Sequence, residues 1–476
     1  MHIYFMGIGG TAMGSVAILL KENGYRVSGS DQSLYPPMSD QLADSGIEVF
    51  TGYDAERLEA LNPDTIVVGN VIGRGNPEAE WVLETRKIPF VSLPQLIGEQ
   101  LIGRRRSIVI SGTHGKTTTT ALTTHLLRQC EVEPGYLIAG VCFDQEPSAA
   151  VGNLHAPFVI EGDEYDCAFF DKRSKFMHYL PRTLVINNLE FDHGDIFRDI
   201  QDIQRSFSHL VRLVPKSGQI LINGDDDKLV NWVTDEAHSE IWRVGFEKHN
   251  DLQIKGFRES SDGSRFEFRL KGASWMKVKW PLAARYNARN AAMASLATAL
   301  QLFPDDPGQF QTNGFATFHG VKRRQQKLFE NSRYLIMEDF GHHPTAVKET
   351  LESLRHRYPK HQLWCAFEPR SNTSRSPAFQ TIWPEALVQA DQVWIGAIHR
   401  IHLLQPNQRL NTEQLAKTLT ETGTPAAAFV ENPALQKDLL ESLSKTEKPT
   451  LLVFFSNGSF DGVMQQTVRA LQAEDC

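Results

Sequence analysis

A strand that runs into a glycine-rich loop and then into a helix is the feature that most limits how this chain folds. The apolar segment Ser107–Ser111 predicts the strand, and the residues that follow it are Gly112, Thr113, His114, Gly115, Lys116, Thr117 and Thr118. A complete phosphate-binding loop has a glycine five positions before the glycine of its Gly-Lys pair, whereas Ile110 stands here, so the loop is shortened. Its backbone N–H groups can still surround phosphate oxygens, Lys116 can neutralise β- and γ-phosphates, and the Thr117 hydroxyl can bind Mg²⁺. The loop therefore predicts an α/β unit that binds a nucleotide phosphate, with a chance sequence of this composition as the alternative.

A second glycine-rich loop lies near the N-terminus. Its residues Gly7, Ile8, Gly9 and Gly10 follow a predicted strand and open a predicted helix. The segment Gly7–Ala12 satisfies the G-x-G-x-x-G/A pattern, and Asp31 ends the next strand, where the ribose-binding acid of a dinucleotide fold stands. The pattern indicates a bound nucleotide diphosphate. NAD and a purely structural turn also fit it, and nothing in it separates NAD from a UDP-sugar.

Short apolar strands alternate with helical patterns along all 476 residues, which is too long for one ordinary domain. We predict three successive α/β units with boundaries at residues 1–106, 107–322 and 323–476. The basic run Arg104–Arg106 closes the first unit, and a long Ala-rich helix at Ala288–Leu302 lies in the second. Ligands of open α/β sheets bind at the carboxyl ends of strands, where both glycine loops are expected.

The composition narrows the class of protein. The net charge of −8 argues against nonspecific nucleic-acid binding, and no apolar run is long enough to span a membrane. The N-terminus has neither the basic region nor the cleavage site of a signal peptide, so a cytoplasmic location is expected. The five cysteines include Cys476 and form no C-x-x-C pair, which disfavours a disulfide framework or a zinc site.

Two further residues are candidate ligands for a metal beside the Lys116 loop. Glu161 ends a predicted strand, and His193 follows another predicted strand. Magnesium bound to a nucleotide needs oxygen ligands beyond the loop, and both residues stand where such ligands would be placed. A solvated acid or a hydrogen-bonded histidine explains either residue alone equally well.

From these residues onward the chain resembles the Mur ligase family, which builds the peptide of bacterial peptidoglycan. The patterns Gly-Thr-x-Gly-Lys-Thr-Thr, Glu-x-Asp-Glu and Asn-x-Glu-x-Asp-His at residues 112–118, 161–164 and 188–193 match its central-domain signature. The resemblance covers essentially the whole chain. It implies an α/β fold with a Rossmann-like UDP-binding domain, a central P-loop ATPase domain with a mainly parallel sheet, and a C-terminal Rossmann-like domain that binds the amine substrate. It also implies an acyl-phosphate route that uses ATP and Mg²⁺.

The resemblance assigns roles to further residues. It implies catalytic Lys116, Glu161, His193, Arg323 and Arg324, of which the hinge arginines reach ATP phosphate, and metal ligands Thr117, Glu161 and His193. Besides the loop, the implied ATP contacts are Asn287, Asn290, Asp339 and His342. The implied UDP-sugar contacts are Gly7, Ile8, Gly9, Gly10, Ser30, Asp31, Asn70 and Asn76.

Several segments favour the members of the family that attach recycled L-alanyl-γ-D-glutamyl-meso-diaminopimelate to UDP-N-acetylmuramate. The main ones are the insertion Asp166–Phe176 and the segment Glu368–Thr373. Guanidinium groups suit a tripeptide with several carboxylates, so Arg370, Asn372 and Arg375 are the candidate peptide-binding residues, with surface arginines as the alternative. UDP-N-acetylmuramate and the tripeptide are the expected partners, with no nucleic acid or membrane partner, and the chain is expected to be a monomer or weak dimer.

Two departures limit this transfer, and three other functions stay open. Ser208 stands where many members carry a carbamylated lysine, so no carbamate is expected. Phe340 replaces a tyrosine and removes any hydrogen bond from that position. The alternatives are the same chemistry with L-alanine as the amine, an NAD-dependent oxidoreductase, and a noncatalytic ATP-binding regulator.

Overall fold

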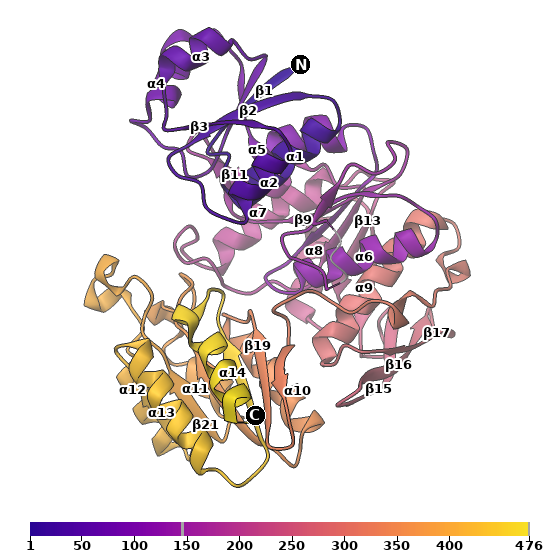
Figure 1. Ribbon diagram of the computed structural model, residues 1–476. Coiled ribbons are helices and arrows are strands. Elements are labelled where there is room, and N and C mark those ends of the chain that lie inside the picture. Colours follow the sequence, from indigo (N-terminus) through magenta and orange to yellow (C-terminus); the bar gives the residue numbers. More distant parts are fainter. Residues whose placement is uncertain (144–146, 475–476) are drawn as a thin grey trace.

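The computed structural model describes residues 1–143 and 147–474, and it arranges them around three large sheets that follow one another along the chain (Figure 1). Cys476 lies outside the described residues, and the four cysteines within them form no disulfide with one another. Within the described part of the chain, no helix has the length and apolar character that crossing a membrane requires. The prediction of three α/β domains is confirmed for the architecture, while the boundaries at residues 106 and 322 stay predictions.

The N-terminal sheet is parallel and has the order β3-β2-β1-β4-β5. Its strands are β1 (His2–Met6), β2 (Arg26–Asp31), β3 (Glu48–Thr51), β4 (Thr65–Val68) and β5 (Phe90–Ser92). The helices are α1 (Thr11–Glu22), α2 (Met38–Asp44), α3 (Ala55–Leu61), α4 (Pro77–Thr85) and α5 (Leu93–Leu96). Strand β1 is central and buried throughout, so the loop that follows it opens at the middle of the carboxyl edge.

The central sheet has ten strands in the order β17-β16-β15-β14-β13-β12-β6-β9-β7-β8. They are β6 (Ser107–Ser111), β7 (Gly135–Leu137), β8 (Ala149–Ala150), β9 (Phe158–Gly162), β12 (Thr183–Ile186), β13 (Gln219–Asn223), β14 (Glu240–Gly245), β15 (Leu252–Ser260), β16 (Gly263–Leu270) and β17 (Ala273–Trp280). The helices are α6 (Lys116–Gln129), α7 (Ile200–Leu213), α8 (Asp227–Glu236) and α9 (Arg285–Leu302). From β15 to β7 in this order, each strand pairs in parallel with the next. Strands β15, β16 and β17 pair antiparallel, as two successive hairpins.

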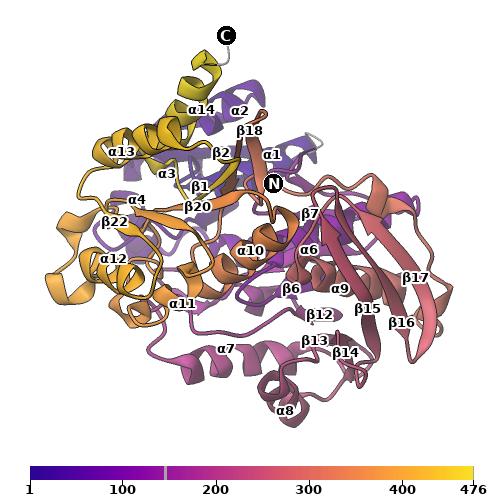
Figure 2. The same cartoon turned by 90° about the horizontal axis from the view of Figure 1, so that it is seen from below.

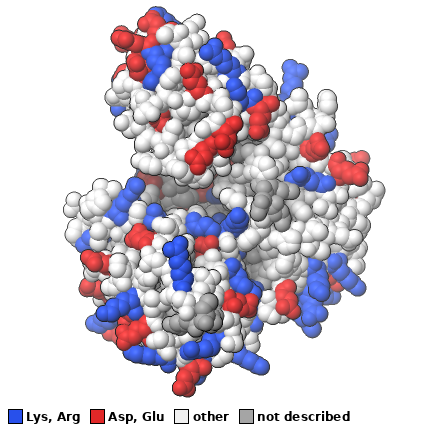
Figure 3. Space-filling view, in the orientation of Figure 1, with Lys and Arg blue, Asp and Glu red and all other residues white. Residues whose placement is uncertain are grey.

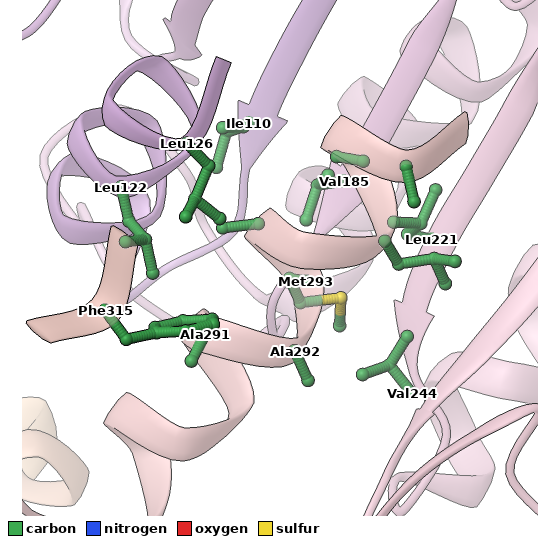
Figure 4. Close-up of a cluster of buried hydrophobic side chains, with 14 of the residues drawn as sticks. Ile110, Leu122, Leu126, Val185, Leu221, Val244, Ala291, Ala292, Met293 and Phe315 are labelled. Carbon is green, nitrogen blue, oxygen red and sulfur yellow. The ribbon is translucent and has the colours of Figure 1, made fainter. Parts of the chain in front are cut away.

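Helix α9 is buried against α6 and the central sheet, and small residues make this possible. Figure 4 shows Ala291, Ala292 and Met293 of α9 in one cluster with Leu122 and Leu126 of α6 and with side chains of the strands. Alanine lets helices approach closely without leaving voids. The helix begins at Arg285, before the expected Ala288, because the polar segment Tyr-Asn-Ala-Arg-Asn forms its first turns.

The C-terminal sheet has the order β18-β19-β23-β20-β21-β22, with only the edge strand β18 antiparallel. Its strands are β18 (Gln326–Glu330), β19 (Tyr334–Asp339), β20 (Gln362–Phe367), β21 (Gln392–Ile395), β22 (Ala426–Ala428) and β23 (Thr450–Phe455). The helices are α10 (Pro344–Arg357), α11 (Trp383–Leu387), α12 (Thr412–Glu421), α13 (Asn432–Lys445) and α14 (Val463–Glu474). Separate apolar clusters cover its two faces, as alternating side chains of a doubly covered sheet require. The N-terminal and C-terminal domains both form hydrogen bonds with the central domain, whose helices and strands are seen from below in Figure 2. The surface is hollowed between the two outer lobes (Figure 3).

Candidate active site

The first glycine loop is held by the strand beside it. The Ser30 carbonyl oxygen accepts hydrogen bonds from the backbone N–H groups of Gly7 (2.8 Å) and Ile8 (3.1 Å). Asp31 Oδ2 accepts one from the Gly9 N–H at 2.8 Å. Gly7 has a φ of +83°, which glycine adopts without strain, and Gly10 precedes helix α1. Six of the eight predicted UDP-sugar residues therefore lie at one strand–loop–helix junction: Gly7, Ile8, Gly9, Gly10, Ser30 and Asp31.

Glu78 is a buried carboxylate under this junction to which the sequence analysis assigned no role. It accepts hydrogen bonds from the Ser30 hydroxyl (2.6 Å), the Tyr4 hydroxyl (2.8 Å) and the Arg57 guanidinium (3.0 Å). Asn76 caps helix α4, because its side-chain oxygen accepts bonds from the N–H groups of Glu78 and Ala79. The side chains of Ser30 and Asn76 therefore support the loop from beneath, and direct contact of either with a ligand stays a prediction.

Asn70 makes a contact between two domains. Its side-chain amide donates to Asp166 Oδ1 at 3.2 Å. Asp166 begins the predicted insertion, which forms an antiparallel hairpin of β10 (Asp166–Ala168) and β11 (Asp171–Ser174). Lys172 forms an ion pair with Asp166 at 2.6 Å, so the hairpin places a cation beside the N-terminal domain.

The second glycine loop is held by residues from distant parts of the central domain. Its His114 N–H donates to Asn188 Oδ1 at 2.8 Å. Gly115 has a φ of +82°, and a Cβ there would lie 2.5 Å from Asn290 Oδ1 and 2.7 Å from Asn187 Nδ2. The side-chain amide of Asn290 donates to Asn287 Oδ1 at 3.3 Å. The predicted residues Asn287 and Asn290 are thus buried on helix α9, directly behind the loop.

Carboxylates surround Lys116 and Thr117. The Thr117 hydroxyl donates to Glu161 Oε2 at 3.0 Å, and the Ala139 N–H donates to Glu161 Oε1 at 2.7 Å. Burial raises the pKa of Glu161, because its anion has lost water and the nearby cations Lys116 and Arg324 compensate only in part. An oxygen cluster short of positive charge suits a hard divalent cation, so Thr117 and Glu161 fit the predicted magnesium site.

Glu164 joins Lys116 to His193, and it is the site carboxylate whose role the sequence analysis missed. Its Oε2 lies 2.8 Å from Lys116 Nζ, and its Oε1 lies 3.1 Å from His193 Nε2. Burial is the largest single influence on His193 and acts to lower its pKa, but the hydrogen bond to Glu164 and the charges of Asp192 and Glu164 together outweigh it, so the pKa is raised. The position of Glu164 three residues after Glu161 was the available signal, since strand β9 ends between them.

The two hinge arginines both lie against the Phe340 ring but make different further contacts. The Arg323 guanidinium donates to the carbonyl oxygens of Ser456 (2.9 Å) and Gly458 (2.6 Å), inside the C-terminal domain. Arg324 lies with its guanidinium 4.9 Å from the centre of the Phe340 ring, and its charge acts on Glu161 and Asp339. Arg324 is therefore the hinge arginine that faces the phosphate loop.

The predicted peptide-binding residues share one cavity with the candidate metal ligand His193. The cavity has a volume of about 360 Å³, and its walls include Tyr165, His193, His342, Arg370, Ser371, Asn372, Thr373, Arg375, His399, Arg400 and Asn457. Arg375 donates to Asn372 Oδ1 at 2.6 Å and to the His399 carbonyl oxygen at 3.1 Å. Burial lowers the pKa of His342 to about 4, so this ring is neutral at pH 7. The cavity is cationic through its arginines, and His399 and Arg400 are members that the sequence analysis did not find.

The segment that carries His193 is docked onto the C-terminal domain. The Thr345 hydroxyl donates to Glu190 Oε2 at 2.5 Å, and His343 Nε2 lies 3.1 Å from the Phe191 carbonyl oxygen. Asp192 accepts from the Thr373 hydroxyl, so three consecutive residues contact the other domain. Asp339, a predicted ATP contact, stabilises the same domain's hinge by accepting from the N–H groups at positions 325 and 341.

Comparison with known proteins agrees with this geometry. Residues 2–105 match the family described as "Mur ligase family, catalytic domain", and residues 110–298 match "Mur ligase middle domain". A UDP-N-acetylmuramate–L-alanyl-γ-D-glutamyl-meso-2,6-diaminoheptandioate ligase of Escherichia coli K12 is 39% identical over 99% of this chain and 98% of its own. A crystal structure of a murein peptide ligase from Psychrobacter arcticus 273-4 shares 32% identity over 99% of this chain and 98% of its own, with a TM-score of 0.69. A UDP-N-acetylmuramate–L-alanine ligase of Clostridium tetani is 30% identical over 83% of each chain.

These matches extend over both glycine loops and, in the full-length relatives, over the cationic cavity between the central and C-terminal domains, and the chain therefore belongs to the Mur ligase family.

Proposed function

We propose that this chain joins the tripeptide L-alanyl-γ-D-glutamyl-meso-diaminopimelate to UDP-N-acetylmuramate, with ATP converted to ADP and phosphate. The Escherichia coli relative carries the name of this activity over nearly its whole length. The observation that carries the proposal is the cavity in which Arg370, Arg375 and His193 meet. It places cationic groups suited to peptide carboxylates next to the candidate phosphate-transfer site. The product returns a recycled peptide to peptidoglycan synthesis.

The route begins with phosphoryl transfer to the lactyl carboxylate of UDP-N-acetylmuramate. This step depends on positioning and charge neutralisation more than on covalent help from the protein. Lys116 and the loop N–H groups neutralise the phosphates, and Arg324 faces the same site. The free amine of the peptide then attacks the acyl phosphate, and the tetrahedral intermediate expels phosphate.

Magnesium would be held by the Thr117 hydroxyl and the Glu161 carboxylate, with His193 as a further ligand. Bound there, it would supply positive charge to the phosphate oxygens. His193 makes its hydrogen bond to Glu164 and has a backbone φ of +55°, a left-handed conformation that the surrounding contacts must maintain. Glu164 therefore acts as a positioning residue that holds both Lys116 and His193.

Contact between domains protects the acyl phosphate from water. The docked segment 190–192 fixes the C-terminal domain against the loop that carries His193. A water-excluding arrangement strengthens electrostatic interactions and prevents hydrolysis of a reactive intermediate. We infer that the domain boundaries near residues 106 and 322 are where the outer domains move relative to the central one.

A side-by-side ligation assay with the tripeptide and with L-alanine tests the amine. Tripeptide-dependent release of phosphate is expected, and turnover with L-alanine alone would instead support the function named for the Clostridium tetani relative. Arg370→Ala should raise the KM for tripeptide and leave the KM for UDP-N-acetylmuramate unchanged. The exposed Arg104→Ala is the matched control, and an equal rise in both KM values would refute the assignment of Arg370.

A further inference from the structure

Two histidines and one glutamate from three separate segments meet outside the candidate magnesium site. His114 belongs to the second glycine loop, Glu190 follows strand β12, and His343 precedes helix α10 of the C-terminal domain. Glu190 Oε2 lies 3.4 Å from His343 Nδ1 and 3.8 Å from His114 Nε2. The three ligand atoms all lie within 4.8 Å of one another. None of these atoms is part of the phosphate or peptide contacts proposed above.

The hydrogen bonds around His343 fix which of its nitrogens carries a proton. The Phe191 carbonyl oxygen can only accept, so His343 Nε2, at 3.1 Å, donates to it. The Thr345 backbone N–H can only donate, and it points to His343 Nδ1 at 3.3 Å. Nδ1 is therefore unprotonated and turned towards the carboxylate of Glu190. A ligand imidazole whose other nitrogen donates to a backbone carbonyl is the arrangement seen in metal sites.

At neutral pH no proton lies between His343 Nδ1 and the carboxylate of Glu190 that faces it. Burial and the neighbouring His114 lower the pKa of His343 to about 4, so its ring stays neutral. Burial acts to raise the pKa of Glu190, but its interactions with His114, His343 and Thr345 lower it to about 2, so it is an anion. His114 Nε2 is buried, and it lies 3.8 Å from Glu190 Oε2, which is longer than a hydrogen bond. The Nδ1 of His343, the carboxylate of Glu190 and the Nε2 of His114 thus converge on one point, and the Thr345 N–H and hydroxyl are the groups that donate to the first two.

We propose that His114, Glu190 and His343 form a binding site for a divalent transition metal of the zinc type. Zinc bonds of about 2.0–2.1 Å place tetrahedral ligands about 3.3 Å apart, close to the observed 3.4 and 3.8 Å. Two imidazoles and one carboxylate favour such a metal over magnesium, which prefers oxygen ligands. The fourth position is left to water.

The bound metal ties the phosphate loop to the C-terminal domain. His114 lies two residues before Lys116, and His343 begins the helix of the opposite domain. A metal that bridges them opposes the separation of the two domains and inhibits turnover. This inhibition rests on the proposed ligase function, whereas metal binding itself does not.

Metal binding is measured on the full-length protein with Zn²⁺ by calorimetry and with Co²⁺ by visible absorption, which reports tetrahedral coordination. Glu161→Ala is used as the background, because it removes the candidate magnesium site as a competing ligand set. One Zn²⁺ per chain is expected in this background. His343→Asn should weaken Zn²⁺ binding by at least about tenfold. Asparagine preserves the cap of helix α10 but is a poor zinc ligand.

Two further variants complete the experiment. Glu190→Gln should weaken Zn²⁺ binding as His343→Asn does, whereas the exposed His238→Asn should leave it unchanged. Unaltered binding in both ligand variants, or no bound Zn²⁺ in the Glu161→Ala background, would overturn the site. If Zn²⁺ binds as expected but does not slow ligation by the wild-type protein, the metal site stands and the inhibitory role is wrong. An inactive wild-type protein that binds Zn²⁺ would instead count against the ligase function alone.

Discussion

The two glycine loops have the same strand–loop–helix form but different surroundings. The first loop follows β1 and is held by its own domain, through Ser30 and Asp31 of the neighbouring strand. The second loop follows β6 and is held by Asn188 and by Asn290 of helix α9, which are far away in the sequence. Of the two loops, only the second contains a lysine, Lys116. Two carboxylates contact this loop: Glu164 bonds to Lys116, and Glu161 bonds to Thr117. From this difference we predict that the first loop binds a diphosphate and that the second transfers a phosphoryl group.

Lys116→Ala is expected to have the largest effect on this contrast. It removes the cation that neutralises the transferred phosphate, and kcat should fall by about 10³-fold. Lys21→Ala, in the helix that follows the first loop, is the control and should leave kcat unchanged. Steady-state ligation kinetics and circular dichroism of both variants are the measurements. Near-normal turnover of the folded Lys116→Ala protein would contradict the assignment of phosphoryl transfer to the second loop.

Gly115→Ala tests the second loop through its backbone. A left-handed non-glycine residue costs on the order of 1–3 kcal/mol, and the added Cβ would also overlap Asn290 and Asn187. The KM for ATP should therefore rise by roughly 5- to 150-fold, with the KM for UDP-N-acetylmuramate unchanged. Initial-rate measurements with each substrate varied in turn decide the point. A rise confined to the sugar nucleotide would mean that the two loops have been assigned to the wrong ligands.

Gly9→Ala is the matched change in the first loop, with a smaller expected effect. A Cβ at this position would lie 2.8 Å from Leu34 Cδ2 and 2.9 Å from Asp31 Oδ2, which are ends of side chains that can move. Overpacking of this kind costs about 1–2 kcal/mol, so the KM for UDP-N-acetylmuramate should rise roughly 5- to 30-fold. The KM for ATP should stay as in the wild type. An opposite pattern in either glycine variant would contradict the division of labour between the loops.

The sequence predicted both loops because local residues determine them. Glycine, lysine and threonine at fixed spacing specify a phosphate loop wherever a strand precedes and a helix follows. The contacts that distinguish the loops come from elsewhere: Glu164 meets His193 across two strands, and Thr345 and Thr373 reach segment 190–192 from another domain. Periodicity carries no information on such pairings. Helix capping was missed for the same reason: the side-chain oxygen of Asn76 caps α4, while the contact of Asn76 with the UDP-sugar stays a prediction.

Asp31 gives the smallest and sharpest test, because its carboxylate has two explanations. In the structure Oδ2 accepts from the Gly9 N–H, so Asp31 positions the loop. If Asp31 binds a ribose hydroxyl instead, its other carboxylate oxygen, Oδ1, must accept the hydrogen bond from that hydroxyl. Loss of one hydrogen bond costs about 0.5–1.5 kcal/mol, so Asp31→Ala should raise the KM for UDP-N-acetylmuramate roughly 2- to 10-fold. Asparagine keeps one oxygen for Gly9 and places an amide where the second oxygen stood. Asp31→Asn should therefore restore the wild-type KM if positioning is the role, whereas a KM as high as that of the alanine variant would assign the second oxygen to the ligand.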